Sequence, residues 1–268
     1  MWHATPLPTQ KRRLIEEAAF FIQLSAMKTF TILTIFPHIF DSYINESILK
    51  RAQEKKKILF KILNIRDHAK DKHQQVDDKP YGGGAGMLMK VEPIFLCLKK
   101  NGLIVYDAKS KQYKTRSKKT KIILLDARGE RFTQARTHAL CALNDLVFIC
   151  GHYEGVDERV AKFVDMKISL GDFVLTGGEL PALCVIDSIA RLIPGVLGKD
   201  ESLREESFVK EGYGEYPQYT RPEIFEPKKG VLWRVPNVLI SGHHQKIQEW
   251  KKKMSYEGRT FLPHGFAD

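Results

Sequence analysis

The sequence predicts an α/β domain with a largely parallel central sheet, followed by a small, mainly helical C-terminal domain. Three observations lead to this fold class. Short apolar runs rich in β-branched residues alternate with segments of helical spacing over most of the chain. Glycine-rich loops follow two of these runs, as they do at the carboxyl ends of strands in open α/β sheets. Roughly the last sixty residues show little strand pattern and one clear helix.

Several apolar runs are predicted to be strands. The first, at residues 29–36, is β-branched and aromatic and is ended by Pro37, which is typical of a buried strand. The others are equally short and are bounded by turns; they cover residues 58–65, 104–107, 121–126 and 146–150.

Four segments have the apolar spacing of helices. Residues 39–52 and 87–98 are amphipathic. Residues 180–193 form the strongest helix pattern, because Pro181 stands near its start and a Pro-Gly pair ends it. A fourth helix is expected at residues 245–254, near the C-terminus.

Composition predicts a globular protein and an acidic partner. The chain has 268 residues, of which 43% are hydrophobic and 28% charged, so disorder, collagen and coiled coil are excluded. Lys and Arg total 43 against 32 Asp and Glu, which gives a net charge of +11. This surplus points to a polyanion, most simply nucleic acid, although a merely basic enzyme is the alternative.

We expect a cytoplasmic protein with no membrane span. The four cysteines are far apart and form no CxxC pair, so a disulfide framework or a zinc site is not expected. No run of about 18 apolar residues occurs. Residues 1–26 lack a clear cleavage site and are interpreted as an N-terminal extension. The predicted domains are residues 27–195 and 207–268, joined by a charged, flexible linker at 196–206.

The segment between Lys99 and Lys121 is strongly basic. It contains nine basic residues and a single acid, Asp107. Two interpretations stay open at this stage, a solvated loop and a segment that contacts phosphates.

The glycine loop at residues 79–86 resembles a phosphate-binding loop only weakly. It lacks the Gly-Lys-Ser/Thr ending of a Walker loop, and its spacing is not GxGxxG. A nucleotide hydrolase is therefore disfavoured, and a tight backbone turn is the simpler interpretation.

Two later loops are better candidates for a ligand site. Residues 150–159 and 169–179 each follow an apolar strand and combine glycines with polar and acidic residues. Glycines let the backbone approach a ligand and hydrogen-bond to an adenine edge or a ribose. His152 could act as a base, but a single loop histidine is more often a surface or hydrogen-bonding residue.

Six motifs occur in order along the chain. They are YGGGAGM at 81–87, GHYEGVDER at 151–159, GDFVLTGGELP at 171–181, IPGVLG at 193–198, YTRP at 219–222 and LISGHH at 239–244. Together they closely resemble the bacterial TrmD family, the tRNA (guanine-N(1)-)-methyltransferases, over residues 27–262.

The resemblance implies a fold and an activity. The fold would be a trefoil-knotted α/β domain of the SPOUT class, with the knot within about residues 124–176, in an obligate homodimer whose active site is shared between subunits. S-adenosylmethionine would donate a methyl group to N(1) of the guanosine immediately 3′ of the tRNA anticodon, giving 1-methylguanosine and maintaining the reading frame. The sequence does not decide whether magnesium assists, and it predicts no protein metal site. A non-catalytic RNA-binding module on the same scaffold is the alternative.

The resemblance also implies site residues. The methyl donor would be bound by Leu125, Gly151, Tyr153, Glu154, Leu170, Gly171, Asp172, Phe173, Val174, Leu175, Gly177, Gly178 and Pro181. The tRNA would contact Ser207, Tyr219, Arg221 and His243.

Two further residues would perform the chemistry. Arg191 matches the family's catalytic arginine, although it could instead be an i,i+4 partner of Asp187. Glu206 stands where the family usually has an aspartate base, and Glu205 beside it is the fallback. Glutamate offers the same carboxylate on a side chain longer by one C–C bond, about 1.5 Å.

Overall fold

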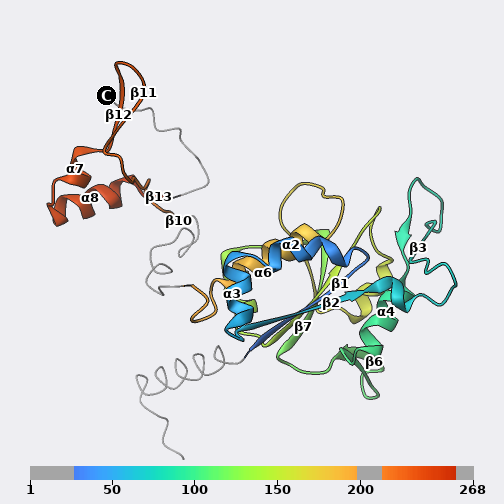
Figure 1. Ribbon diagram of the computed structural model, residues 1–268. Coiled ribbons are helices and arrows are strands. Elements are labelled where there is room, and N and C mark those ends of the chain that lie inside the picture. The colour runs from blue at the N-terminus through green and yellow to red at the C-terminus, as the bar shows by residue number, and fades with distance from the viewer. Residues whose placement is uncertain (1–26, 198–212, 258–268) are drawn as a thin grey trace, which may run out of the picture. The chain divides into compact units, whose positions relative to one another are not determined.

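The structure is a computed structural model that describes residues 27–197 and 213–257 (Figure 1). The chain divides into two compact units, residues 1–198 and 199–268. The boundary falls inside the linker expected at 196–206, of which only Val196 and Leu197 are described. The extension at residues 1–26 also lies outside the described residues, so its expected character stays a prediction.

A five-stranded parallel sheet forms the centre of the first unit, with the strand order β2-β1-β8-β7-β9. This confirms the predicted α/β class. The strands are β1 (Lys28–Thr34), β2 (Ile58–Asn64), β7 (Thr120–Arg131), β8 (Asp145–Cys150) and β9 (Met166–Ser169). Strand β7 is longer than the predicted 121–126. After a register shift between Leu125 and Glu130, its last residues pair with the end of β9.

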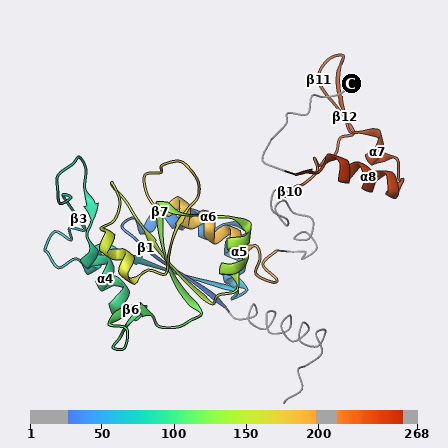
Figure 2. The same cartoon turned by 180° about the vertical axis from the view of Figure 1, so that it is seen from behind.

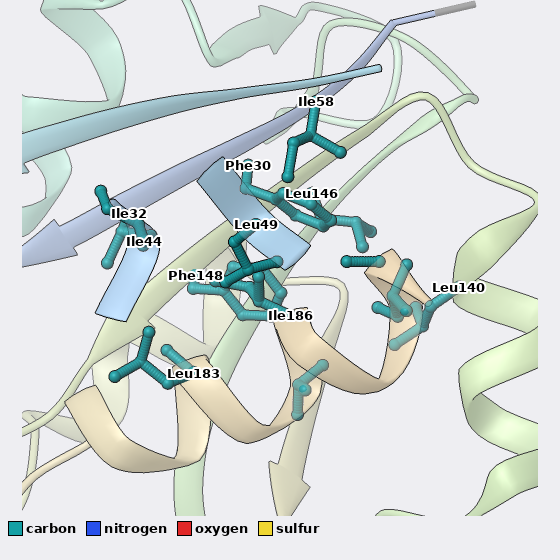
Figure 3. Close-up of a cluster of buried hydrophobic side chains, with 14 of the residues drawn as sticks. Phe30, Ile32, Ile44, Leu49, Ile58, Leu140, Leu146, Phe148, Leu183 and Ile186 are labelled. Atoms are coloured by element: carbon teal, nitrogen blue, oxygen red, sulfur yellow. The ribbon is translucent and has the colours of Figure 1, made fainter. Parts of the chain in front are cut away.

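Both faces of this sheet are buried, and side chains alternate between them. On β8, Leu146 and Phe148 belong to one core, whereas Val147 and Ile149 belong to the other. Parallel sheets are covered by helices on both faces, which explains the continuous apolar runs in the sequence. Figure 3 shows the first core, in which strand side chains such as Phe148 face Ile186 on helix α6 (Glu179–Ala190).

Helices α2, α3, α5 and α6 cover the first face, and α4 covers the second with two short 3₁₀ turns, η2 and η3 (Figures 1 and 2). Another 3₁₀ turn, η1, leads into α2. These elements are η1 (Pro37–Phe40), α2 (Asp41–Ile44), α3 (Ser47–Glu54), η2 (Ile65–His68), α4 (Val91–Lys100), α5 (Gln134–Cys141), η3 (Glu158–Phe163) and α6 (Glu179–Ala190).

Two predicted helices have different boundaries in the structure. The helix expected at 39–52 is interrupted before α3, because Glu46 adopts an extended conformation with ψ 157°. The helix expected at 87–98 begins only at Val91, because the preceding β4 (Leu88–Met89) pairs with β3 (Asp77–Asp78). In both cases the apolar spacing included residues that the structure places in another conformation. They are the extended Glu46 in the first helix and strand β4 in the second.

A two-stranded ribbon, β5 with β6, lies outside the central sheet. The strand predicted at 104–107 is present as β5 (Ile104–Asp107), but it pairs antiparallel with β6 (Gln112–Thr115). Strand β6 lies within the basic segment and was not predicted, since its apolar content is low. The ribbon lies beside α4 in both views (Figures 1 and 2).

The C-terminal unit contains the predicted helix as α8 (His244–Met254), preceded by α7 (Asn237–Ile240). It also contains two short antiparallel ribbons that the sequence did not indicate. They are formed by β10 (Tyr213–Gly214) with β13 (Tyr256–Glu257), and by β11 (Ile224–Lys228) with β12 (Val231–Arg234).

Candidate active site

A cavity of about 510 Å³ opens at the carboxyl ends of β7, β8 and β9. Its walls come mainly from the ends of these strands and the loops that follow them, at residues 124–128, 151–156, 168–171 and 173–178, with Leu88, Glu158 and Pro181. Parallel sheets place ligands at this edge, because the loops there are free to vary while the strands hold them in place.

Twelve of the thirteen residues predicted to bind the methyl donor line this cavity. The exception is Asp172. Its side chain is 90% exposed, and its Oδ2 lies 3.5 Å from a guanidinium nitrogen of Arg131 at the end of β7. Asp172 therefore points toward the outer end of β7 in this structure.

A close backbone contact joins two of the loops. The Gly178 N–H donates to the Gly151 carbonyl at 2.8 Å, and His152 and Gly177 form an isolated antiparallel bridge. A Cβ on Gly178 would lie 2.7 Å from the Cα of Cys150, which real Cβ atoms essentially never do. Position 178 therefore requires glycine, since any side chain would push the start of α6 away from β8.

The loop after β8 has an unusual backbone conformation. Tyr153 has a φ of 59°, in the left-handed region that non-glycine residues rarely adopt. Neighbouring hydrogen bonds hold it there: the Glu154 N–H donates to the Met87 carbonyl at 3.1 Å, and the Gly155 carbonyl accepts from the Met89 N–H at 2.9 Å. Such a conformation persists only where the surroundings fix it.

The glycine loop supports this arrangement from outside. A Cβ on Gly86 would lie 2.2 Å from Cγ of Glu154, so the two segments are in close contact. Gly82, Gly83 and Gly84 also have positive φ values, between 80° and 122°. The loop thus forms tight turns against the cavity wall, as its interpretation as a backbone turn predicted.

The cavity has a net excess of acidic groups. The Arg128 guanidinium donates two hydrogen bonds to Asp126, at 3.2 and 3.0 Å, and a third to Glu158 at 3.3 Å, while the Arg128 backbone N–H donates to Asp126 at 2.9 Å. Burial acts to raise the pKa of Asp126, but the hydrogen bonds and charge of Arg128 outweigh it, so this pKa is lowered. The pKa of Glu158 is lowered mainly by its hydrogen bond from Lys167, at 2.6 Å.

Glu154 is the acidic residue of the cavity wall whose charge is not neutralised by a cation of the described ranges. It forms no ion pair with any residue in the described ranges, and its side chain lies at the cavity. A cationic ligand would therefore find a carboxylate available in this wall.

A buried polar cluster lies beneath the cavity. Glu179, the first residue of α6, is only 4% exposed and accepts a hydrogen bond from Oγ1 of Thr34 at 2.7 Å. His152 lines the cavity, and its ring packs edge-on against Phe36 and Tyr153. Its Nδ1 is buried without a hydrogen-bond partner in the described part of the chain. His152 is thus a wall residue held by ring packing, and its Nδ1 lacks the hydrogen bond that the hydrogen-bonding interpretation expected.

Arg191 is not among the residues that line the cavity. It caps the C-terminus of α6, where its backbone N–H donates to the Asp187 carbonyl at 3.2 Å. Helix α6 has 12 residues and begins beside the cavity at Gly178. At a rise of 1.5 Å per residue, Arg191 lies about 18 Å along the helix from that end. A single chain does not bring these two predicted parts of the site together.

The remaining predicted residues divide into two groups. Glu205, Glu206 and Ser207 lie outside the described residues, and their roles stay predictions. In the C-terminal unit, Tyr219, Arg221 and His243 are described and exposed. Tyr219 contacts the ring of Trp250 on α8, with 6.3 Å between ring centroids.

Neither a metal centre nor a membrane span is found in the described part of the chain. Over residues 27–197 and 213–257, no group of three or more His, Cys, Asp or Glu side chains is placed to hold a metal ion. Within the same ranges, no helix is long and apolar enough to cross a membrane.

Comparison with known proteins decides the family. The family described as "tRNA (Guanine-1)-methyltransferase TrmD" matches residues 27–262, which is most of the chain. This chain belongs to the TrmD family.

Individual members are similar over nearly their whole length. A tRNA (guanine-N(1)-)-methyltransferase of Clostridium botulinum (strain Eklund 17B / Type B) is 50% identical over 227 residues, covering 85% of this chain and 87% of the relative. One from Desulfitobacterium hafniense (strain Y51) is 48% identical over 233 residues, 87% of this chain and 81% of the relative. The crystal structure of tRNA (m1G37) methyltransferase from Aquifex aeolicus superposes with a TM-score of 0.64 at 38% identity, covering 84% of this chain and 88% of that one.

Several cavity residues were not predicted from the TrmD motifs. Asp126, Arg128 and Glu158 contribute its charged wall, and Thr34 and Glu179 its buried support. A charged Asp-Ala-Arg-Gly sequence directly after a buried strand is the signal that could have indicated the first two. Nothing in the sequence pairs Thr34 with Glu179, because they are 145 positions apart.

We expect Gly178→Ala to weaken binding of S-adenosylmethionine at least tenfold, because the added methyl group would separate α6 from β8 and open the cavity. Calorimetric titration measures this directly. Gly230→Ala is the control for strain outside the cavity: its φ of 83° makes alanine strained there, but the added Cβ meets no atom within 4 Å and the position lies in the C-terminal unit. Equal donor affinity in the Gly178 variant and the unaltered protein would show that this contact does not shape the cavity.

Proposed function

We propose that this chain transfers a methyl group from S-adenosylmethionine to N(1) of the guanosine immediately 3′ of the tRNA anticodon. Membership of the TrmD family supports the reaction and the substrate class. The observation that supports it most directly is the cavity at the ends of β7, β8 and β9, which gathers twelve of the thirteen residues expected to hold the donor.

The chemistry of the cavity fits this donor. S-adenosylmethionine supplies a methyl group on a positively charged sulfur, beside an amino group that is also positive. The uncompensated carboxylate of Glu154 suits such a ligand. Leu124, Leu125 and Leu170 offer apolar surface for an adenine ring, while the glycine-rich loops can present backbone groups to its edge.

The acceptor requires a base. Guanine N(1) bears a proton at neutral pH, so its lone pair is free to react only after that proton is removed. A carboxylate within hydrogen-bond reach can accept the proton, and we assign this role to Glu206. Negative charge then develops on O6 of the guanine. The guanidinium of Arg191 can stabilise that charge with two parallel hydrogen-bond donors.

We propose a homodimer in which each active site uses both subunits. Arg191 lies at the far end of α6 from the cavity of its own chain, so a second copy is the simplest source of an arginine there. Large apolar side chains are exposed on η1, α2 and the start of α6: Phe36, Ile39, Tyr43 and Leu180 are between 39% and 57% exposed. An apolar surface of this kind is typical of an interface.

The C-terminal unit is proposed to bind the tRNA. Over residues 215–254 it has eight Lys and Arg against four acidic residues. Exposed aromatic residues accompany these cations, and Lys251 lies 4.5 Å from the ring centroid of Tyr216. Cations that contact phosphates and aromatic rings that can stack on unpaired bases are the usual elements of RNA recognition, and Tyr219, Arg221 and His243 belong to this surface.

Labelled methyl transfer to an unmodified tRNA transcript tests the reaction. We expect product with guanine next to the anticodon and none with adenine there. Adenine has no N(1)–H to donate to the Glu206 carboxylate, and it has an amino group in place of the O6 that Arg191 would bind, so it makes neither contact that positions guanine. Glu206→Gln should bind S-adenosylmethionine normally yet lower the single-turnover rate by about 10²–10⁴-fold. Glu205→Gln is the matched control. An unchanged rate in the Glu206 variant would assign the base elsewhere.

Mixed dimers test the shared site. Gly178→Ala weakens donor binding and Arg191→Ala removes the guanidinium, so each variant alone should be nearly inactive when the donor is kept below its Kd for the unaltered protein. In a randomly reassembled equal mixture, half of the dimers are mixed and each has one complete site, so about a quarter of the unaltered activity should return. No recovery, with mixed dimers demonstrated by mass spectrometry, would mean that both groups act within one chain.

A further inference from the structure

The basic hairpin, which we define as residues 104–119, comprises β5, β6 and the turn that leads into β7. The described structure gives it a fixed form in place of a solvated loop. Six cationic side chains are exposed on it: Lys109, Lys111, Lys114, Arg116, Lys118 and Lys119. Asp107 is its single acid.

Asp107 is engaged within the hairpin itself. One carboxylate oxygen accepts from the backbone N–H of Lys109 at 3.1 Å, and the other accepts from Nζ of Lys114 at 2.6 Å. These bonds, with that of Lys114 the strongest, lower the pKa of Asp107 to about 2. The carboxylate therefore fixes the turn and neutralises Lys114, and it leaves the other cations of the hairpin without a partner charge.

Five of those cations are uncompensated. No ion pair with any residue of the described ranges is formed by Lys109, Lys111, Arg116, Lys118 or Lys119. Like charges at such density repel one another and disfavour the folded state, so they contribute nothing to holding this hairpin together. A polyanion would relieve the repulsion by binding across them.

The hairpin is anchored firmly enough to present these charges. The ring of Tyr113 on β6 packs edge-on against Phe95 of α4 at 4.8 Å between centroids, and Phe95 packs against Phe163 of η3 at 5.7 Å. Tyr106 packs against Tyr113 at 5.3 Å and is itself 56% exposed. A pre-ordered cationic surface loses less conformational entropy on binding than a flexible one.

The hairpin joins β7 at the amino end of that strand, whereas the cavity lies at the carboxyl ends of β7, β8 and β9. The Lys119 carbonyl accepts from the backbone N–H of Asn144, just before β8 begins, whereas the cavity starts at the other end of β7 with Leu124 and Leu125. Five residue steps along β7, from Thr120 to Leu125, span about 17 Å. The start of β7, where the hairpin ends, therefore lies at the opposite end of that strand from the cavity.

We propose that the basic hairpin binds the phosphate backbone of the tRNA at a distance from the target guanine. The identity of the RNA rests on the proposed function, whereas the binding surface rests on the geometry and charge of residues 104–119. Backbone contacts raise affinity without reading sequence. The hairpin should accordingly affect tRNA binding and KM, and leave the chemical step unchanged.

A pair of matched variants tests this. The hairpin variant carries Lys109→Gln, Lys111→Gln, Lys118→Gln and Lys119→Gln. The control variant carries Lys50→Gln, Lys56→Gln, Lys61→Gln and Lys72→Gln, four exposed lysines outside the hairpin. Both lose the same net charge. Binding of a fluorescent tRNA transcript is measured by anisotropy from about 50 to about 200 mM salt, the range over which phosphate contacts dominate affinity.

We expect the hairpin variant to bind tRNA about tenfold more weakly or worse, and its slope of log K against log salt to fall by about 0.7–0.9 per lost contact. The loss should be the same with guanine or adenine next to the anticodon. The control should change little, and donor affinity and kcat at saturating tRNA should be unaltered in both variants.

Equal losses in the two variants would reduce the effect to net charge and overturn the proposal. No loss in the hairpin variant would overturn it as well, as would a fall in kcat at saturating tRNA. These outcomes are distinct from failure of the proposed function. If the unaltered protein bound tRNA but transferred no methyl group, the binding comparison would still decide the role of the hairpin.

Discussion

The backbone contact between Gly178 and the end of β8 is the constraint on which the candidate site depends. It joins the loop after β9 to the loop after β8 and fixes where α6 begins. Two segments that are more than twenty residues apart thus become one wall of the cavity. Glu179, buried and hydrogen-bonded to Thr34, ties that wall to the carboxyl end of β1. A cavity built in this way is ordered before a ligand enters, which reduces the entropy cost of binding.

Charge is distributed in the first unit in a way that fits a small cationic donor and a large anionic acceptor. The cavity wall is acidic, and Arg128 neutralises part of it through Asp126 and Glu158. The chain as a whole is strongly basic, with a net charge of +11. The two ligands of a methyl transfer to RNA have opposite charges, so a local acidic cavity in a basic protein separates their binding sites electrostatically.

The sequence predicted those features that depend on local pattern. The apolar runs of β1 and β8 identified a buried parallel sheet, because both faces of such strands are covered and the apolar run is continuous. The family motifs identified the loops that meet at the cavity. Asp172 shows the limit of a motif: the backbone passes the cavity, but this side chain turns to Arg131.

Other features depend on contacts that no local pattern records. Strand β6 lies in a lysine-rich stretch, and it forms because Tyr113 packs on Phe95 and Asp107 fixes the turn. The break before α3 depends on one extended residue, Glu46, within an otherwise helical spacing. The separation of Arg191 from the cavity follows from the length of α6, and it is seen only when the helix is placed in three dimensions.

A crystal structure of the full chain with S-adenosylmethionine is the most direct measurement of the central claim. The account predicts density for the donor within the cavity, with its adenosine against residues 170–178 and its charged end near Glu154. Donor density elsewhere on the molecule, or an unoccupied cavity at saturating donor, would contradict it.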